Sequence, residues 1–287
     1  MQVLHKLIRY IKLKNESCII YIGLGVDEYD IFWELAGEMR RNILFKLKEK
    51  SMKLSQLAKT LDVSIQEVHR NINRLIDAGL VEKDPDGLLI LTTYGEIVLT
   101  QIPSFQFLSK NKPYFEEHTL GDLPMKFIQR IGALNNSELI NGVVAILARW
   151  KDMYRNANEH IMEIMAQVPL DLIEPIVDRL NHGVKFSYIF GENTIVPKGR
   201  RELLQKFGWN NFMNKGLVER RMIKRVQVMV IVTDKEAGVL FPNKKGETDM
   251  NKMFYSRDPL FHEWCLDFFR YTWYASDIFD ETKIKEI

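Results

Sequence analysis

Residues 51–92 contain two short amphipathic segments on either side of a three-residue interruption, SMKLSQLAKTLDVSIQEVHRNINRLIDAGLVEKDPDGLLILT. Apolar residues recur in both at the spacing of one helical face, first at Leu54, Leu57, Ala58 and Leu61, and then at Val68, Ile72, Leu75 and Ile76. Ser64 and Glu67 have the spacing of a capping box, which predicts where the second helix begins, and Gly79 predicts where it ends. The pattern therefore predicts two short helices around a tight turn.

The residues that follow predict a β-hairpin. Two short apolar runs, 80–83 and 88–91, flank Asp84-Pro85-Asp86-Gly87, which has the composition of a hairpin loop. An amphipathic helix is expected upstream within 31–50, and a second capping box at 93–96 predicts a short helix through Leu99. Together these elements predict a winged helix-turn-helix domain over residues 31–102, with the wing at 81–92.

The second short helix, residues 64–78, is the recognition helix in this arrangement, and its first turns lie against base edges in the major groove of DNA. With Val68 and Ile72 buried, a step of about 100° per residue turns the polar side chains of the helix outward. Arginine can pair with guanine or phosphate, and asparagine and glutamine can read adenine. The predicted DNA-binding residues are Ser64, Gln66, Glu67, His69, Arg70, Asn71, Asn73, Arg74 and Lys53. On an isolated helix such a face would indicate only solvation, whereas the complete helix-turn-helix and wing favour DNA binding.

Charge gives weaker support for DNA binding. Between residues 31 and 100, acidic residues are as numerous as basic ones, and the wing tip is acidic. Binding to phosphate needs local positive potential rather than net charge. We expect such a surface from Arg40, Arg41, Lys46, Lys53 and Lys59. A winged helix that binds a protein instead of DNA stays open as the alternative.

Length and composition indicate a soluble protein of two domains, since the chain has 287 residues, of which 46% are hydrophobic and 27% charged. Cys18 and Cys265 offer neither a disulfide framework nor a CxxC metal site, which fits the cytoplasm. Within the N-terminal extension, residues 1–30, a basic stretch precedes an apolar run at 18–26. That run is too short to span a membrane and lacks a cleavage site, so we expect neither export nor a membrane partner. No cofactor or metal is expected.

A second domain, residues 103–287, is predicted after a junction at 101–104. Residues 134–167 are expected to be mainly helical, and 169–180 to form another helix closed by Asn181-His182-Gly183. The β-branched and aromatic residues of 184–190 and 226–232 predict strands, with 237–241 returning as a hairpin. The expected fold class is α+β, a winged helix followed by a mixed α/β domain.

Several segments beyond the winged helix resemble archaeal regulators of the methanogenesis-regulator (Fil-type) family. They are Phe107-Leu108-Ser109-Lys110, Tyr114-Phe115-Glu116-Glu117-His118, Leu123-Pro124, Arg130-Ile131-Gly132-Ala133-Leu134, Asp234-Lys235-Glu236-Ala237 and the run from Ser256 to Cys265. The resemblance covers roughly residues 31–275, and the winged helix is also similar to those of ArsR-like and TrmB-like regulators. It implies a DNA-binding transcriptional regulator with a C-terminal domain for sensing or dimerisation.

The C-terminal domain also loosely resembles phospholipase-D-like sensor modules. The related enzymes use an HxK motif, in which histidine attacks phosphorus and lysine holds the phosphate. None of the six histidines of this chain is followed two residues later by lysine. GxSxG, GxxxxGK[ST], HExxH and a GxGxxG after a strand are also missing. We therefore expect a protein without enzymatic activity.

Other residues of the second domain are weaker candidates for a site. His262 and Cys265 are one helical turn apart, but a packed cysteine and a surface histidine are favoured over a metal site. Aromatic residues between 264 and 274 indicate core or a dimer interface more than a ligand pocket. Contacts to a small-molecule effector are guessed at Asp234, Lys235, Arg257, Asp258 and Trp264.

These patterns together predict a homodimeric transcriptional regulator that binds double-stranded DNA sequence-specifically. A dimer is expected because one recognition helix reads too few bases for useful specificity. A small-molecule effector of the C-terminal domain is an elaboration of the same hypothesis.

Overall fold

The computed structural model describes residues 30–284 and 286. The chain divides into two compact units, Met1–Leu99 and Thr100–Ile287. The predicted N-terminal extension, residues 1–30, lies outside the described residues except for Asp30. Among the helices that the structure describes, none combines the length and apolar character needed to cross a membrane.

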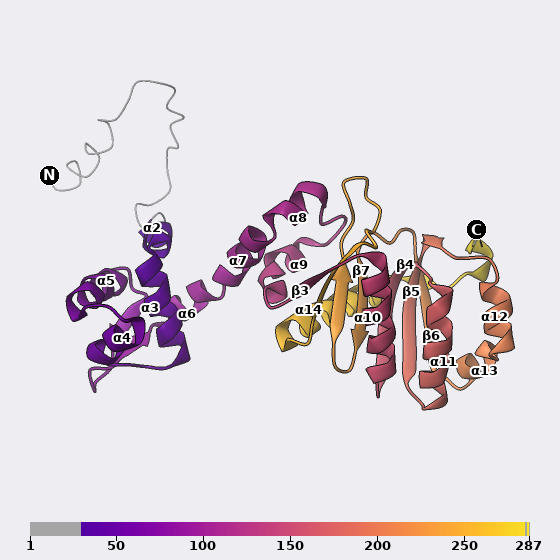
Figure 1. Ribbon diagram of the computed structural model, residues 1–287, viewed down its shortest axis with the longest axis horizontal. Coiled ribbons are helices and arrows are strands. Elements are labelled where there is room, and N and C mark those ends of the chain that lie inside the picture. Colours follow the sequence, from indigo (N-terminus) through magenta and orange to yellow (C-terminus); the bar gives the residue numbers. More distant parts are fainter. Residues whose placement is uncertain (1–29, 285, 287) are drawn as a thin grey trace, which may run out of the picture. The chain divides into compact units, whose positions relative to one another are not determined.

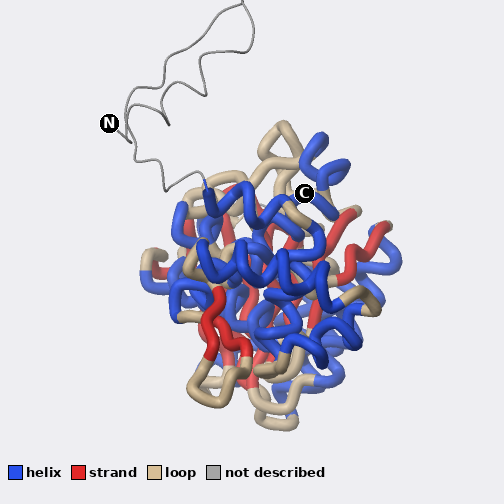
Figure 2. Tube along the Cα trace, turned by 90° about the vertical axis from the view of Figure 1, so that its left-hand side faces the viewer, coloured by secondary structure: helices blue, strands red, loops and turns tan. Residues whose placement is uncertain are grey.

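The first unit is helical with one small hairpin (Figures 1 and 2). Its elements are α2 (Asp30–Ala36), α3 (Glu38–Glu49), α4 (Leu54–Leu61), α5 (Ile65–Asp77), β1 (Val81–Lys83), β2 (Leu89–Leu91) and α6 (Thr93–Leu99). This order confirms the predicted winged helix-turn-helix.

The turn between α4 and α5 is shaped by two polar residues. Asp62 has a left-handed backbone with φ of 54°, which ends α4. The hydroxyl of Ser64 accepts a hydrogen bond of 3.1 Å from the backbone N–H of Glu67, so the Ser64 half of the predicted capping box is present. Leu57 and Val68 are fully buried where the two helices pack. The apolar spacing of this segment therefore predicted its packing correctly.

The wing is an antiparallel pair of strands in which Val81 lies opposite Leu91. Asp84 closes its loop, because one carboxylate oxygen accepts from the backbone N–H groups of Asp86 and Leu88 at 3.0 and 2.7 Å. Gly87 follows with φ of 74°.

Helix α6 begins differently from the prediction. The side chain that accepts from the N–H of Gly95 is the hydroxyl of Thr92, at 3.0 Å, so the cap lies one residue before the predicted Thr93. Gly95 itself packs on the start of the wing, where a Cβ atom would lie 2.1 Å from the carbonyl oxygen of Leu80. The absence of a side chain thus allows α6 to approach the wing.

The second unit contains a sheet of eight strands within the described residues, in the order β10-β6-β5-β4-β7-β8-β9-β3. The strands are β3 (Glu138–Asn141), β4 (His160–Gln167), β5 (Lys185–Ile195), β6 (Val218–Ile223), β7 (Met229–Thr233), β8 (Ala237–Leu240), β9 (Lys252–Ser256) and β10 (Asp277–Ile278). The α-helices are α7 (Ile102–Lys110), α8 (Lys112–Glu117), α9 (Met125–Gln129), α10 (Val143–Asn156), α11 (Ile173–Asn181), α12 (Arg200–Lys206), α13 (Trp209–Asn214) and α14 (Pro259–Tyr274). Short 3-10 helices are Ile131–Leu134, Leu170–Leu172 and Glu281–Lys283.

Strand β4 lies at the centre of this sheet, parallel to β5 and antiparallel to β7. The expectation that residues 134–167 are mainly helical is therefore wrong for β4, although α10 confirms it for 143–156. A central strand covered on both faces carries no alternation of apolar and polar residues, so its apolar spacing resembles that of a buried helix. The predicted helix α11, strands β5 and β7 and hairpin strand β8 are confirmed.

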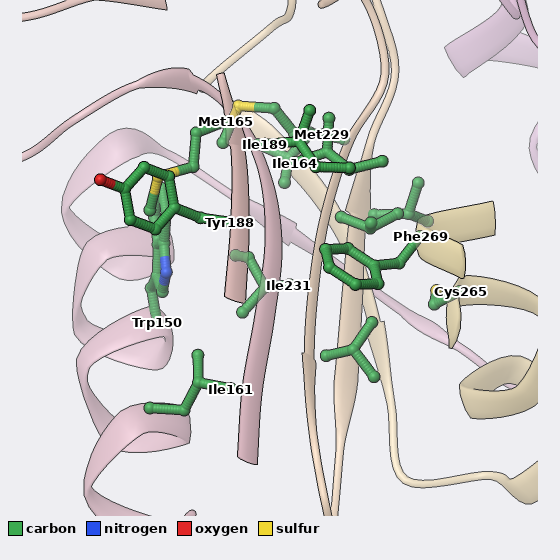
Figure 3. Close-up of a cluster of buried hydrophobic side chains, with 14 of the residues drawn as sticks. Trp150, Ile161, Ile164, Met165, Tyr188, Ile189, Met229, Ile231, Cys265 and Phe269 are labelled. Carbon is green, nitrogen blue, oxygen red and sulfur yellow. The ribbon is translucent and has the colours of Figure 1, made fainter. Parts of the chain in front are cut away.

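Helices cover both faces of the sheet. Figure 3 shows Trp150 of α10 and Tyr188 of β5 on one side of the strands, with Cys265 and Phe269 of α14 on the other. All four residues are buried. The whole chain is thus α+β, a winged helix followed by a mixed α/β unit.

Candidate nucleic-acid interface

Helix α5 presents one polar face to solvent and buries the opposite face. Val68 and Ile72 have 0% and 1% of their surface exposed. Opposite them, five of the predicted DNA-binding residues of the helix are exposed, namely Gln66, His69, Arg70, Asn73 and Arg74. The rotation of the helix is therefore the one that the sequence predicted.

Three other predicted residues also take part in the structure of the helix. Ser64 caps it, as described above. Asn71 is half-buried and donates a hydrogen bond of 2.9 Å to the backbone carbonyl of Glu67, whose side chain is also half-buried. These side chains lie at the edges of the exposed face.

Arg74 is held by a carboxylate of α2 that the sequence analysis did not include. Its Nη2 atom lies 2.5 Å from Oε1 of Glu34, and its Nε atom lies 3.1 Å from Oε2. The second arginine on this carboxylate is Arg40, with its Nε atom 2.8 Å from Oε2. The side chain of Glu34 is only 11% exposed. The hydrogen bond that Arg74 donates to Glu34 raises the pKa of Arg74 further above its usual value, and two of its guanidinium nitrogens are engaged in this pair.

Three members of the expected phosphate-binding surface have partners within the fold. Arg40 donates to the carbonyl of Trp33 at 2.9 Å, and Arg41 to that of Leu35 at 2.8 Å, so both cap the C-terminal end of α2. Lys46 pairs with Glu49 at 2.9 Å. These three side chains are engaged because free carbonyls and a carboxylate lie within reach, and phosphate binding by them stays a prediction. Lys53 and Lys59, the other two members, are exposed.

Large apolar side chains are also exposed in this unit. Ile65, in the first turn of α5, is 54% exposed, and Phe32 and Trp33 of α2 are 63% and 68% exposed. The sequence analysis did not single them out. An apolar side chain at the start of the recognition helix can contact a thymine methyl group or a protein surface.

In the second unit, the guessed effector residues have partners within the fold. One carboxylate oxygen of Asp234 accepts from the backbone N–H of Asn158 at 2.8 Å. Together with the N–H of Glu159, this hydrogen bond lowers the pKa of Asp234, against the opposing effect of burial. The ammonium group of Lys235 donates to the carbonyl of Asn156 at 2.6 Å.

The remaining guessed residues are also engaged. Arg257 pairs with the buried carboxylate of Glu236 at 3.1 Å. Asp258 caps α14 through the N–H of Leu260 at 2.9 Å. Trp264 is fully buried, and its indole N–H donates to the carbonyl of Phe127 at 3.0 Å. These contacts give each of the polar residues a role in stabilising the fold. Effector binding by the guessed residues stays a prediction.

The histidine and cysteine of α14 are also packed. Cys265 is fully buried, and burial raises the pKa of its thiol. His262 is half-buried rather than at the surface, with Nε2 2.6 Å from the carbonyl oxygen of Thr233.

Comparison with protein families gives one match, to the family model HVO_A0114 over residues 38–99. This range lies within the first unit and contains the helix-turn-helix and wing. No curated protein matches the chain.

Similar solved structures are distant in sequence. TrmBL2, an archaeal chromatin protein, is 12% identical with a TM-score of 0.40, over 89% of this chain and 100% of that one. Nuc from Salmonella typhimurium, a phospholipase D family member, is 16% identical with a TM-score of 0.35, over 51% of this chain and 100% of that one. The ArsR family regulator RHA00566 is 22% identical with a TM-score of 0.24, over 31% of this chain and 97% of that one. The resemblance to Fil-type regulators stays a prediction.

Proposed function

We propose that this protein is a sequence-specific DNA-binding transcriptional regulator. The observation that carries the proposal is the exposed polar face of α5 within a complete helix-turn-helix and wing. In this proposal, Gln66, Arg70 and Asn73 contact base edges in the major groove, since their side chains have the donors and acceptors that distinguish base pairs. Lys53 and Lys59 contact phosphates on the flanks.

The second unit is proposed to dimerise the regulator and to sense an effector, and the protein is proposed to act in the cytoplasm. Two recognition helices on a two-fold axis read enough bases for specificity, which a single helix does not. The proposal includes no catalytic step. The proposal of a protein without catalysis is supported by the sequence, which lacks the HxK motif because no histidine is followed two residues later by lysine.

The first test is selection of genomic fragments with the purified full chain at moderate salt. An enriched fragment is then titrated against a scrambled one. We expect a palindromic site that is bound about a thousandfold or more tightly than the scrambled fragment. If binding stays weak, steeply salt-dependent and equal for both fragments, the proposal of sequence-specific regulation is wrong.

The second test replaces Arg70, which is exposed and has no ion pair among the described residues. Arg70→Ala is expected to weaken binding to the selected site by about 1–3 kcal/mol if Arg70 makes a bidentate base contact. Arg155→Ala is the matched control, because Arg155 is an arginine of the second unit with 59% of its side chain exposed. Equal affinity of the two variants in a gel-shift titration would remove Arg70 from the interface.

A second candidate function is a winged helix that binds a protein. Two observations favour it: Ile65 is exposed on α5, and Arg74 is already paired with Glu34. This candidate predicts negligible DNA affinity even at low salt, and loss of a protein complex on Ile65→Ser.

A further inference from the structure

A groove of about 510 Å³ lies between helices α9 and α14 in the second unit. Its walls carry two cations of α9, Lys126 and Arg130, and two phenol rings of α14, Tyr271 and Tyr274. None of its lining residues belongs to the effector residues that the sequence suggested. Small-molecule sites have volumes of about 300–1,000 Å³, so the groove has room for a small ligand.

The two helices that form the walls are joined by buried contacts. Phe127, a lining residue of α9, is 1% exposed, and its ring packs edge-on against Phe268 of α14 with the ring centres 5.2 Å apart. The carbonyl of Phe127 also accepts the hydrogen bond from the indole of Trp264 at 3.0 Å. Because these contacts fix α9 against α14, the groove exists before a ligand arrives, which lowers the cost of binding.

The groove carries one more positive charge than negative charge. Arg130 donates from Nη1 to Oδ2 of Asp267, a third charged residue of the lining, at 2.7 Å, so these two charges balance. Lys126 has no ion pair within the part of the chain that the structure describes, and its ammonium nitrogen lies 3.8 Å from the ring centre of Tyr271. A tyrosine ring attracts a cation but does not neutralise it. The ammonium group of Lys126 therefore still needs a counterion.

An aromatic surface lies in the same groove as this charge. Tyr271 and Tyr274 are three residues apart on α14 and are 43% and 87% exposed. The ring of Tyr271 is already in contact with Lys126, whereas the ring of Tyr274 is almost fully exposed. The next lining residue, Ala275, has a small side chain. A flat aromatic group can therefore pack on Tyr274, since offset or edge-to-face pairs of rings are favourable.

We propose that this groove binds a small aromatic carboxylate, whose carboxylate group pairs with Lys126 and Arg130 while its ring packs on Tyr274. The inference specifies the effector site of the proposed regulator and rests on that function for its regulatory role. One carboxylate cancels the single charge in excess, whereas a phosphate monoester, with about two negative charges at pH 7, would reverse it. A neutral ring would leave Lys126 without a counterion. Both cations of the groove can only donate hydrogen bonds, so the head group must accept them.

Titration of the purified full chain with naphthoate, and in parallel with naphthamide, tests the need for a negative charge. The two probes share one ring system and differ in the charge of the head group. Ligand-observed NMR without DNA gives the dissociation constant of each probe. We expect naphthoate to bind about tenfold or more tightly than naphthamide. Equal affinities, or no binding of either probe, overturn the proposal.

Two exposed positions of the groove locate the probe. Lys126→Met keeps an aliphatic side chain without the charge and should abolish the preference for naphthoate, while Lys215→Met, at an exposed lysine outside the groove, is the matched control. Tyr274→Ala should weaken both probes by about threefold or more. Tyr94→Ala is its control, because Tyr94 is 48% exposed in the first unit. A preference that survives in Lys126→Met contradicts the proposal. So does a Tyr274→Ala variant that changes the oligomeric state and leaves both affinities unchanged, since Tyr274 would then belong to a dimer interface.

The DNA titration repeated with naphthoate separates this inference from the proposed function. A chain that binds naphthoate with the expected preference but has no specific DNA site supports the groove and refutes the regulator. A chain that binds a specific DNA site but shows no preference for naphthoate refutes the groove alone.

Discussion

A carboxyl group buried at the centre of the second unit should make stability depend on pH. Glu163 of strand β4 is 0% exposed, and its Oε1 atom accepts a hydrogen bond of 2.6 Å from the indole N–H of Trp150. Burial raises the pKa of Glu163 from 4.5 to about 8, although the hydrogen bond from Trp150 opposes the rise. Glu163 is therefore protonated in the folded protein at pH 7, while the same residue is ionised in the unfolded chain.

The expected magnitude follows from linkage between proton binding and folding. Between pH 4.5 and about 8, the folded state holds a proton that the unfolded state has released. Stability must then fall as the pH rises through this window, by about 1.4 kcal/mol per pH unit. At pH 7 the loss relative to pH 4.5 reaches about 3 kcal/mol, to be taken as an upper limit. Glutamine cannot ionise and can still accept from Trp150, so Glu163→Gln should remove most of this loss.

Urea unfolding at pH 5, 6, 7 and 8, followed by tryptophan fluorescence, measures the effect. Trp33 is the one tryptophan outside the second unit, so the signal reports mainly on that unit. We expect Glu163→Gln to be close to wild type at pH 5 and more stable by about 2–3 kcal/mol at pH 8. Glu219→Gln, an exposed position on β6, is the matched control. A difference between Glu163→Gln and wild type that stays constant from pH 5 to pH 8 would refute the argument.

Five further substitutions at four positions test the packing of the first unit, each by urea unfolding of the variant against wild type. Ser64→Ala removes the cap of α5 and should lower the free energy of unfolding by about 1 kcal/mol. Ser64→Asp should keep the cap and therefore most of this stability. Gly95→Ala should lower the free energy of unfolding by about 1–3 kcal/mol, because the added methyl group would meet the carbonyl oxygen of Leu80. Gly87→Ala should lower it by about 1 kcal/mol, because Gly87 lies in open space but has a positive φ. Glu34→Gln should cost about 2–4 kcal/mol, since it leaves two arginines without their carboxylate. No loss of stability in Glu34→Gln would show that these ion pairs are not maintained in solution.

The sequence predicted the first unit well because its determinants are local. The cap at Ser64, the turn at Asp62 and the loop closed by Asp84 are each made by residues within a few positions of one another. The exposed face of α5 follows from helical periodicity alone. These are the interactions that spacing along a chain can reveal.

The errors concern contacts between residues that are distant in sequence. The pairing of Arg74 with Glu34 was missed, because the two residues lie 40 positions apart. Strand β4 was predicted as helix because its neighbours β5 and β7, and the helices α10 and α14 that cover its two faces, are brought to it only by the fold. For the same reason the groove between α9 and α14 could not be found from sequence, since Arg130 and Asp267, which pair in it, lie 137 positions apart.

The order of strands in the sheet has a consequence for how the protein is made. Strands β7, β8 and β9 form a local antiparallel meander, whereas the edge strand β3 pairs, among the strands that the structure describes, with β9 alone. A ribosome that has synthesised β3 must therefore add about 110 more residues, on the order of ten seconds of synthesis, before its partner exists. The first unit needs no later residue for its hairpin and can fold during this interval. A nascent chain would thus hold a finished winged helix beside an unfinished sheet, whose exposed strands are the part most in need of a chaperone.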